Sequence, residues 1–438
     1  MLTTLATVTP DPLWGLTAAF RADPRPNKVD LVVGVYRDET GRTPVMAAVK
    51  MAEERLAAAG ASKAYRGLAG NTEFNAGLAA LLLGHDAGRL ARQTTMQTVG
   101  GTGALRLLAD FIAVASPGAR VWVSDPGYVN HVPIMRAAGL MVERYRWQAD
   151  GGVLDADAVL ADLAAARAGD IVLLHGCCHN PTGIDMGLGV WQAVAERCAK
   201  QGLVPLVDMA YLGLAEGLEP DTQGLRQLVD ALDTVLVAAS CSKSMGLYCE
   251  RTGAAMVIGK NMATLQPVGG VLERITRSNY SMPPDHGAAI VAAILADATL
   301  TACWRDELEH MRQRIVGNRR RLDEALASLG APAALQNLSR HKGMFSLLPL
   351  DADAMERLRH CLAVELASFF NRSLQDIDTG VTLDAVVVRN TAIGLVVLGF
   401  ELQHFRNRCI HGQSDVGHST VSGIACQLDH FLTRQSSL

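Results

Sequence analysis

Short apolar runs alternate with longer amphipathic stretches between about residues 95 and 260, and this alternation constrains the fold most. Apolar runs of this length suit strands that are buried on both faces. We expect strands at Val121–Ser124, Ile171–His175, Leu203–Val207, Thr234–Ala239 and Gly253–Gly259. The intervening stretches have helical periodicity at Ala104–Val114, His131–Ala138, Asp155–Ala166, Gly189–Lys200 and Thr222–Leu232. Strand–helix alternation predicts an α/β fold with a mostly parallel sheet. A further helix, rich in Arg and Glu, is expected from about Thr299 to Leu329.

Composition excludes several classes of protein. With 438 residues, 49% of them hydrophobic and 19% charged, the chain can bury a sizeable core and is not disordered. A net charge of −4 gives no electrostatic footprint for nucleic acid. The longest apolar run, Ile393–Phe400, is far below the roughly 18 residues of a membrane helix. The first residues do not resemble a signal peptide, and the nine Cys have no CxxC spacing, so we expect a reduced cytoplasmic protein.

Polar side chains follow the predicted strands at the edge where ligands of parallel sheets bind. The residues after the strands include His131, His175, Asn180, Asp208, Tyr211, Ser240, Ser242, Lys243 and Arg251. A single polar residue at a strand end usually lies in a solvated loop. Because several strands end in residues of complementary charge, we interpret the set as one converging site.

The glycine-rich segment Gly100–Arg106 opens an amphipathic stretch. Glycines let a backbone approach a ligand closely, and free N–H groups at a helix start attract anions. The segment lacks the Gly-Lys-Ser/Thr of a nucleotide-binding loop. A phosphate cup and an ordinary helix start are therefore both open interpretations.

Lysine is scarce, with seven among 40 basic residues, so each one can be weighed. Lys243 follows an apolar strand, where a lysine has a lowered pKa and can bind an aldehyde covalently. Lys260 also follows a strand, but its neighbours indicate an ordinary turn. Asp208 could pair with a pyridinium nitrogen, or it could cap a helix. Arg251 could bind a phosphate group.

His175 and His179 have the spacing of two metal ligands on a helix. Gly176 and Pro181 make a continuous helix there unlikely to form. We therefore predict no metal site.

Long stretches of the chain resemble one family. They are DPLWGL, FRADPRPNKVDLVVGVYRDETGRTPV, VGGTGALR, VWVSDPGYVNH, LLHGCCHNPTGID, VPLVDMAYLGL, SCSKSMGLYCERTG and RSNYSMPPDHGA. Together they resemble the aspartate/aromatic amino acid aminotransferases, class I enzymes that bind pyridoxal 5′-phosphate in fold type I. The resemblance runs from about Asp11 to Ala288, and more faintly to Arg359. It implies a large cofactor domain with a seven-stranded, mostly parallel sheet at about 46–305. The N-terminal segment 1–45 would pack with a small α+β domain at 306–438.

The resemblance also implies catalytic roles. Lys243 is similar to the lysine that binds pyridoxal phosphate covalently and moves the proton. Asp208 matches the partner of the pyridine nitrogen, with His131 and His175 behind it. Tyr211 matches a catalytic residue that, with Asn180, hydrogen-bonds the ring hydroxyl.

Further residues match positions that contact the phosphate or the substrate. The phosphate cup would consist of Gly101, Thr102, Ser240, Ser242 and Arg251, with Tyr65 reaching the phosphate of a neighbouring subunit. Substrate contacts would come from Gly34, Tyr128, Asn180 and, across a homodimer, Arg277, which matches the arginine for a side-chain carboxylate. Amino acids and keto acids are the implied partners.

Two positions depart from the family pattern. Tyr128 stands where the family stacks a Trp on the cofactor ring, and its ring can still stack. The family places Ser-Gly-Arg after a GMFS stretch, and that arginine binds the substrate α-carboxylate. Here Arg372 lies about one position away. From about Cys361 to Leu438 no resemblance is found, and Ala385–Phe400 has no matching place in the fold. A shifted reading frame and a genuine divergent tail both explain this.

The expected activity is transfer of an amino group between aspartate or aromatic amino acids and 2-oxoglutarate. One alternative keeps the cofactor and changes the outcome to decarboxylation or β-elimination. Another is a homologue that binds pyridoxal phosphate but is catalytically impaired, because the residue for the α-carboxylate is displaced.

Overall fold

The computed structural model describes residues 12–25, 29–31, 34–147, 149–150, 153–331, 335–348, 350, 364–369 and 385–389. The chain forms two compact units. The large unit comprises Thr43–Val316 and Arg340–Phe345, and the small unit comprises Met1–Arg42, Gly317–Ser339 and Ser346–Leu438. One long helix, α12 (Ala298–Ser328), contributes residues to both units.

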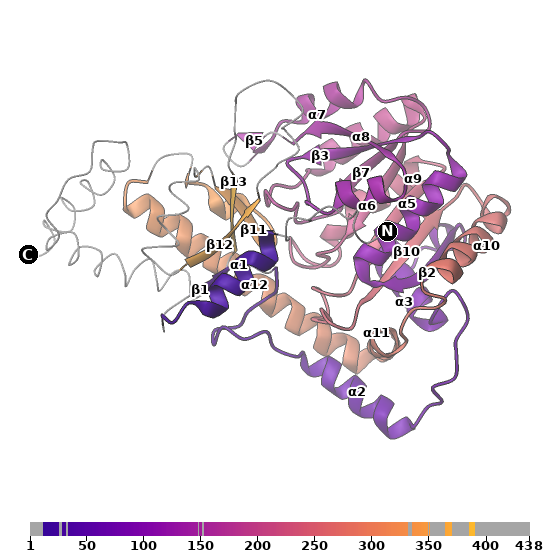
Figure 1. Cartoon of the computed structure of the whole chain (residues 1–438), viewed down its shortest axis with the longest axis horizontal. Coiled ribbons are helices and arrows are strands. Elements are labelled where there is room, and N and C mark those ends of the chain that lie inside the picture. Colours follow the sequence, from indigo (N-terminus) through magenta and orange to yellow (C-terminus); the bar gives the residue numbers. More distant parts are fainter. Residues whose placement is uncertain are drawn as a thin grey trace, which may run out of the picture. The chain divides into compact units, whose positions relative to one another are not determined.

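A seven-stranded sheet in the order β2-β10-β9-β8-β7-β3-β4 forms the centre of the large unit (Figure 1). Its strands are β2 (Gln93–Val99), β3 (Arg120–Asp125), β4 (Met141–Arg146), β7 (Ile171–His175), β8 (Val204–Met209), β9 (Val235–Ser240) and β10 (Thr252–Ile258). Strands β4, β3, β7, β8 and β9 pair in parallel, while β10 runs antiparallel to both of its neighbours. The predicted α/β fold with a mostly parallel sheet is thus confirmed.

The inner strands form because their residues are apolar on both faces. Every residue of β7, β9 and β10 is buried, as expected for strands that are covered by helices on both sides. The β7–β8 register pairs Ile171 with Val204 and ends by pairing His175 with Asp208. Two polar side chains are therefore level with each other where these strands end.

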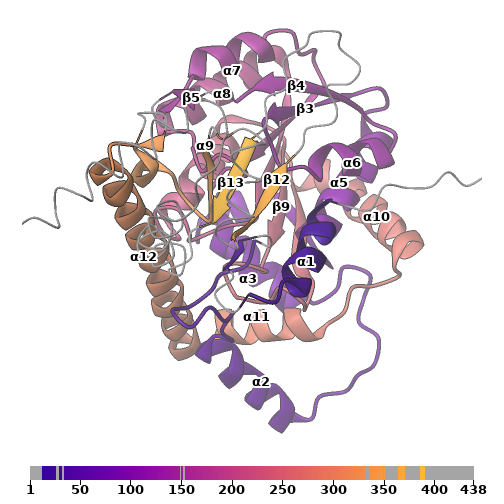
Figure 2. The ribbon, with the colours of Figure 1, turned by 60° about the vertical axis from the view of Figure 1, so that its left-hand side comes forward.

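Helices cover the sheet, and each predicted helix between residues 95 and 260 is present with ends shifted by a few residues. The helices of this unit are α2 (Ala47–Ala59), α3 (Thr72–Leu83), α4 (Ala87–Leu90), α5 (Gly100–Ala115), α6 (His131–Ala137), α7 (Ala156–Leu163), α8 (Leu188–Gln201), α9 (Gln223–Ala231), α10 (Met262–Asn279) and α11 (His286–Ala296). Apolar residues of α5, α6 and α10 share one core with the sheet, and Figure 2 shows α5, α6 and α10 in this region. A short antiparallel pair joins β5 (Ala149–Asp150) to β6 (Val153–Leu154).

The small unit contains a second sheet in the order β1-β12-β13-β11. Its elements are α1 (Pro12–Ala22), β1 (Val29–Leu31), β11 (Phe345–Leu348), β12 (Val364–Phe369) and β13 (Ala385–Arg389). Strand β12 pairs in parallel with β1 and antiparallel with β13. The expectation that Ala385–Phe400 has no place in the fold is therefore wrong for Ala385–Arg389, because this β-branched run completes a sheet.

Among the described residues, no single helix has the length and apolar character of a membrane span. Only the bent pair α11 and α12, whose axes meet at 103°, reaches that length and composition when both helices are taken together.

The burial of the sheet predicts that truncating two leucines of the large unit lowers the free energy of unfolding by very different amounts. Leu173 in β7 is fully buried, whereas Leu188 at the start of α8 is 48% exposed. We expect Leu173→Ala to lower the free energy of unfolding by about 3 kcal/mol, because a cavity then adds to the lost transfer energy. Leu188→Ala should change it by less than about 1 kcal/mol. Urea unfolding followed by circular dichroism measures both, and equal losses would contradict the prediction.

Candidate functional site

A buried carboxylate at the end of β8 is the centre of the candidate site. Asp208 is 6% exposed, and its Oδ2 accepts a hydrogen bond from His131 Nε2 at 2.9 Å. His131 is the first residue of α6 and is itself buried. Burial alone would raise the pKa of the Asp208 carboxyl. The hydrogen bond from His131 and its electrostatic influence, together with those of nearby His175 and Lys243, outweigh burial and hold this pKa below its ordinary value. Asp208 is therefore ionised at neutral pH.

Two further histidines lie beside His131. The ring centroids of His131 and His175 are 5.0 Å apart, and those of His175 and His179 are 4.3 Å apart. His179 stacks on Trp147 with ring centroids 4.1 Å apart. Burial lowers the pKa of His175 to about 3 and lowers that of His179 well below its ordinary value. Both rings are therefore neutral.

The polar atoms of His179 have partners on both sides of its ring. Its Nε2 lies 3.0 Å from Ser124 Oγ, and its Nδ1 lies 2.8 Å from Thr182 Oγ1. These bonds fix the ring without giving it a charge. We call the neighbouring rings of His131, His175 and His179 the histidine column. Among the described residues, no group of three or more His, Cys, Asp or Glu has the arrangement of metal ligands.

Lys243 lies in the loop that follows β9, at the same edge of the sheet. Its Nζ is 4.8 Å from the centroid of the Tyr211 ring, which follows β8. The indole Nε1 of Trp304 in α12 donates to the carbonyl of Ser244 at 2.8 Å, and Gly246 N donates to the Lys243 carbonyl at 3.3 Å. Trp304 is fully buried. It therefore fixes the backbone next to Lys243, a function that sequence reasoning missed.

The start of α5 lies against Ser240, which ends β9, and Arg251, which directly precedes β10. A Cβ on Gly100 would come within 2.5 Å of Arg251 Nη2, and one on Gly101 within 2.9 Å of Ser240 Cβ. Only glycine fits at these two positions. Helix α5 has no side-chain cap at its first residue, so its backbone N–H groups remain donors. Together these groups form a concentration of donors and positive charge that suits an anion.

Arg251 and Ser242 are further residues of this candidate anion site. The Arg251 backbone has φ 55°, a left-handed conformation that costs a side-chain-bearing residue about 1 kcal/mol and is common at functional sites. Its Nη1 donates to the Tyr248 carbonyl at 2.9 Å. Ser242 N donates to Ser240 Oγ at 3.2 Å. Thr102 is exposed in the first turn of α5.

Asn180 and Tyr128 belong to loops at the same end of β7 and β3. Asn180 is 6% exposed, and its Oδ1 is buried without a hydrogen-bond partner among the described residues. Such an atom is typical of a polar site for a ligand. The Tyr128 ring meets the His131 ring edge-on, with centroids 5.2 Å apart and an angle of 89°.

Tyr65 and Arg277 are the remaining predicted site residues of the large unit. Tyr65 is 94% exposed in the segment between α2 and α3, and Arg277 is exposed near the end of α10. Gly34 belongs to the small unit. Arg372 lies outside the described residues.

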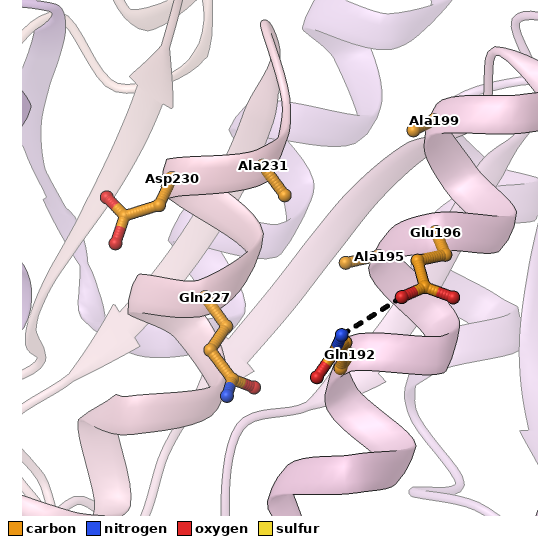
Figure 3. A pocket seen from close by; sticks show the side chains of 7 residues that line it. All are labelled: Gln192, Ala195, Glu196, Ala199, Gln227, Asp230 and Ala231. Carbon is orange, nitrogen blue, oxygen red and sulfur yellow. Dashed lines mark hydrogen bonds between the residues drawn. The ribbon is translucent and has the colours of Figure 1, made fainter.

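A separate groove of about 440 Å³ lies between α8 and α9 (Figure 3). Gln192, Ala195, Glu196, Ala199, Gln227, Asp230 and Ala231 line it. Ala199 and Ala231 stand in the last turns of their helices, which lead into the starts of β8 and β9. None of the residues that line the groove belongs to the cluster around Asp208 and Lys243.

A family model agrees with this architecture. The model described as aminotransferase class I and II matches residues 26–368, well over half of the chain. This match includes the whole of the large unit.

Individual relatives extend this likeness. An aspartate aminotransferase of Salmonella typhi is 45% identical over 352 residues, which cover 80% of this chain and 89% of the relative. An aromatic-amino-acid aminotransferase of Paracoccus denitrificans is 43% identical, with coverage of 82% and 91%. Among solved structures, an aromatic-amino-acid aminotransferase of Burkholderia pseudomallei covalently bound to pyridoxal phosphate superposes with a TM-score of 0.80. It is 39% identical, with coverage of 83% of this chain and 92% of that one.

The buried histidine column predicts a dependence of stability on pH. His175 has a folded pKa of about 3 against an ordinary value of 6.5. Its contribution to stability is therefore complete above about pH 6.5 and decreases as the pH falls toward the folded value, since only the unfolded ring takes up a proton. We expect His175→Gln to unfold with a smaller loss of stability between about pH 7 and about pH 4.5 than the wild type. Urea unfolding over this range measures the difference, and parallel curves would show that the folded ring also titrates.

Proposed function

The chain belongs to the class I and II aminotransferases, and from this premise we propose that it moves the amino group of aspartate or an aromatic amino acid to 2-oxoglutarate. It is a transaminase that depends on pyridoxal phosphate, with the fold of the fold type I enzymes. The names of its relatives include both aspartate and aromatic substrates. The observation that carries the proposal is the buried, ionised Asp208 on the same sheet edge as Lys243 and an anion-binding helix start.

The described residues fit pyridoxal phosphate at each of its polar groups. The start of α5 offers uncapped backbone N–H groups close to the Arg251 guanidinium, and both kinds of donor suit a phosphate. An ionised carboxylate suits a protonated pyridine nitrogen, and Asp208 is kept ionised by His131. The Oδ1 of Asn180 is buried and has no hydrogen-bond partner among the described residues, which suits a contact with the third polar group, the ring hydroxyl.

We assign the side chains as follows. Gly101, Thr102, Ser240, Ser242 and Arg251 would bind the phosphate. Asp208 would hold the proton on the ring nitrogen, with His131 and the neutral His175 supporting it. Asn180 and Tyr211 would hydrogen-bond the ring hydroxyl, and Tyr128 would stack on the ring. We also propose a homodimer in which Tyr65 reaches the partner's phosphate.

Bound pyridoxal phosphate supplies an aldehyde that takes up amines and a ring that withdraws electrons. Lys243 Nζ would hold the cofactor, and with an amino acid bound its free amine would accept the proton of the substrate Cα. Asp208 would hold the proton on the ring nitrogen. Because Lys243 Nζ lies 4.8 Å from the centroid of the Tyr211 ring, both side chains can contact the same ligand.

Binding of the substrate would involve three further residues. We propose that Arg277 recognises a side-chain carboxylate across the dimer, and that Gly34 contacts the substrate through its backbone. Arg372 is our candidate for the α-carboxylate. We also propose a cytoplasmic location.

The proposed function is tested by assaying aspartate, tyrosine and phenylalanine against 2-oxoglutarate in the purified holoenzyme. We expect glutamate to form with at least one donor, and no turnover without the keto acid acceptor. Release of ammonia and a keto acid without an acceptor would indicate elimination instead, and release of carbon dioxide would indicate decarboxylation. A protein that binds the cofactor but forms no product with any donor would favour the impaired alternative.

Lys243 is predicted to carry the cofactor. Borohydride reduction of the holoenzyme should attach the cofactor covalently, and peptide mapping should locate it on Lys243, because this amine follows a buried strand at the site. Lys243→Ala should abolish labelling. Lys260→Ala is the matched control, since Lys260 forms an exposed ion pair with Asp233. Recovery of the label on Lys260 would overturn the assignment.

Arg277 is predicted to select dicarboxylic substrates. A guanidinium binds a carboxylate bidentately, so its loss should reduce kcat/KM for aspartate by at least about tenfold more than for phenylalanine. We suggest Arg277→Gln, with Arg274→Gln on the same helix as the control. Equal losses for both substrates in the Arg277 variant would assign this residue a structural role.

A further inference from the structure

A cluster of charged groups lies behind the loops that follow β7 and β8. It contains Asp185, Glu216, Asp221 and Lys342, to which the site described above assigns no role. Asp221 is 6% exposed and Asp185 is partly buried. Lys342 Nζ donates to Glu216 Oε1 at 2.6 Å. Three carboxylates thus lie around one ammonium group within the large unit.

The Asp185 carboxylate holds the backbone that leads into Asn180. Its Oδ2 accepts from Cys178 N at 2.8 Å, and its Oδ1 accepts from His179 N at 2.7 Å. Bonds between a carboxylate and backbone N–H groups are stronger than neutral ones. The direction in which the chain enters Asn180 therefore depends on Asp185.

Asp221 does the same for the loop that follows Tyr211. Its Oδ2 accepts from Gly213 N at 2.8 Å and from Ala215 N at 3.1 Å, and its Oδ1 accepts from Glu216 N at 2.8 Å. This loop also closes on Tyr211, because Leu214 N donates to the Tyr211 carbonyl at 3.0 Å. One carboxylate therefore determines the path of the chain directly after Tyr211.

The segment around Lys342 connects the two loops. While its ammonium group bonds Glu216 of one loop, its backbone N donates to the Gly183 carbonyl of the other at 2.6 Å. A Cβ on the next residue, Gly343, would come within 2.3 Å of Cys178 Cβ. Close packing and charge thus hold both loops against one segment.

The negative charges of Asp185 and Asp221 do not stabilise the folded chain. Burial raises the pKa of Asp221 to about 6, and burial also raises the pKa of Asp185. Each carboxylate is therefore harder to ionise in the folded chain than in the unfolded one, so its charge weakens folding above the folded pKa. Burial lowers the pKa of Lys342, but Glu216 and the two aspartates outweigh it and raise this pKa. Arg312, near Asp221 and Glu216, adds further positive charge.

We propose that Asp185 and Asp221, with Lys342 as their shared counter-charge, are positioning residues that hold Asn180 and Tyr211 in place. The inference rests on the proposed function, because it explains how the two groups assigned to the ring hydroxyl are kept at the sheet edge. Neither aspartate touches the reacting atoms. Asp185 acts through the backbone of His179, next to Asn180, and Asp221 acts through that of Gly213, two residues after Tyr211.

The test compares the full-length holoenzyme with Asp185→Asn and Asp221→Asn. These amides keep the shape of the carboxylates but remove the charge and one acceptor each. Asp233→Asn is the control, because Asp233 forms an exposed pair with Lys260 in which both side chains are more than half exposed. Lys342→Met is a further variant that retains both carboxylates, so it reports on the cluster even if an Asn variant fails to fold. Urea midpoints identify any variant that has lost its fold.

Two measurements distinguish positioning from a general structural role. The first is the rate at which pyridoxal phosphate leaves the protein on dilution, which we expect to rise about tenfold in both Asn variants. The second is the pH midpoint of the visible absorbance change of the bound cofactor. We expect this midpoint to move up by about one unit, because fewer hydrogen bonds then hold negative charge on the ring oxygen. Lys342→Met should shift it in the same direction by less.

The possible outcomes separate this proposal from the proposed function. Wild-type protein that takes up no pyridoxal phosphate would overturn the proposed function and this inference with it. A wild type that binds the cofactor, with folded Asn variants whose release rate and absorbance midpoint match those of Asp233→Asn, would overturn only the positioning role. An unchanged midpoint in Lys342→Met would remove Lys342 from the proposal.

Discussion

The site depends on one hydrogen bond, between His131 and the buried carboxylate of Asp208. Without it, burial would favour the neutral acid and the sheet edge would lose its negative charge. His131 follows β3 while Asp208 ends β8, and β7 lies between these strands. The parallel register must therefore bring three separate elements to the same level. A slip of one residue would turn the Asp208 side chain to the other face of the sheet.

The histidines next to Asp208 and His131, namely His175 and His179, are neutral. His175 is level with Asp208 in the adjacent strand, yet its pKa of about 3 keeps it uncharged. His179 continues the column and is fixed by Ser124, Thr182 and the stacked Trp147. Because the His175 ring is neutral, it adds no positive charge beside the bond between His131 and the carboxylate. The column thus packs the space behind Asp208 without competing for it.

The inner sheet could be predicted from the sequence because its signal is local. The limits of β7 were predicted exactly as observed, and those of β8, β9 and β10 to within one or two residues, since each run is apolar on both faces. Strands β2 and β4 were not predicted. Their sequences, QTTMQTV and MVERYR, carry polar residues that an edge position tolerates.

Within the site, residues that directly follow a strand could be predicted, because the carboxyl ends of parallel strands meet at one edge of the sheet. Partners distant in sequence could not. Trp304 reaches the carbonyl of Ser244 across 60 residues, and Lys342 reaches Glu216 across 126. Neither contact has a signal in the sequence around its own residue. The tertiary fold alone brings these residues to the site.

Two buried aspartates of the same unit show how the surroundings decide a charge. Asp208 accepts from an imidazole and lies near an ammonium group, and its pKa is lowered. Asp221 accepts from three backbone N–H groups but lies near another carboxylate, and burial raises its pKa to about 6. The first charge is stabilised where a ligand would need it. The second weakens folding at neutral pH, yet it orders the loop beside Tyr211. A loop held by an unfavourable charge is consistent with a fold in which the geometry of the site takes precedence over stability.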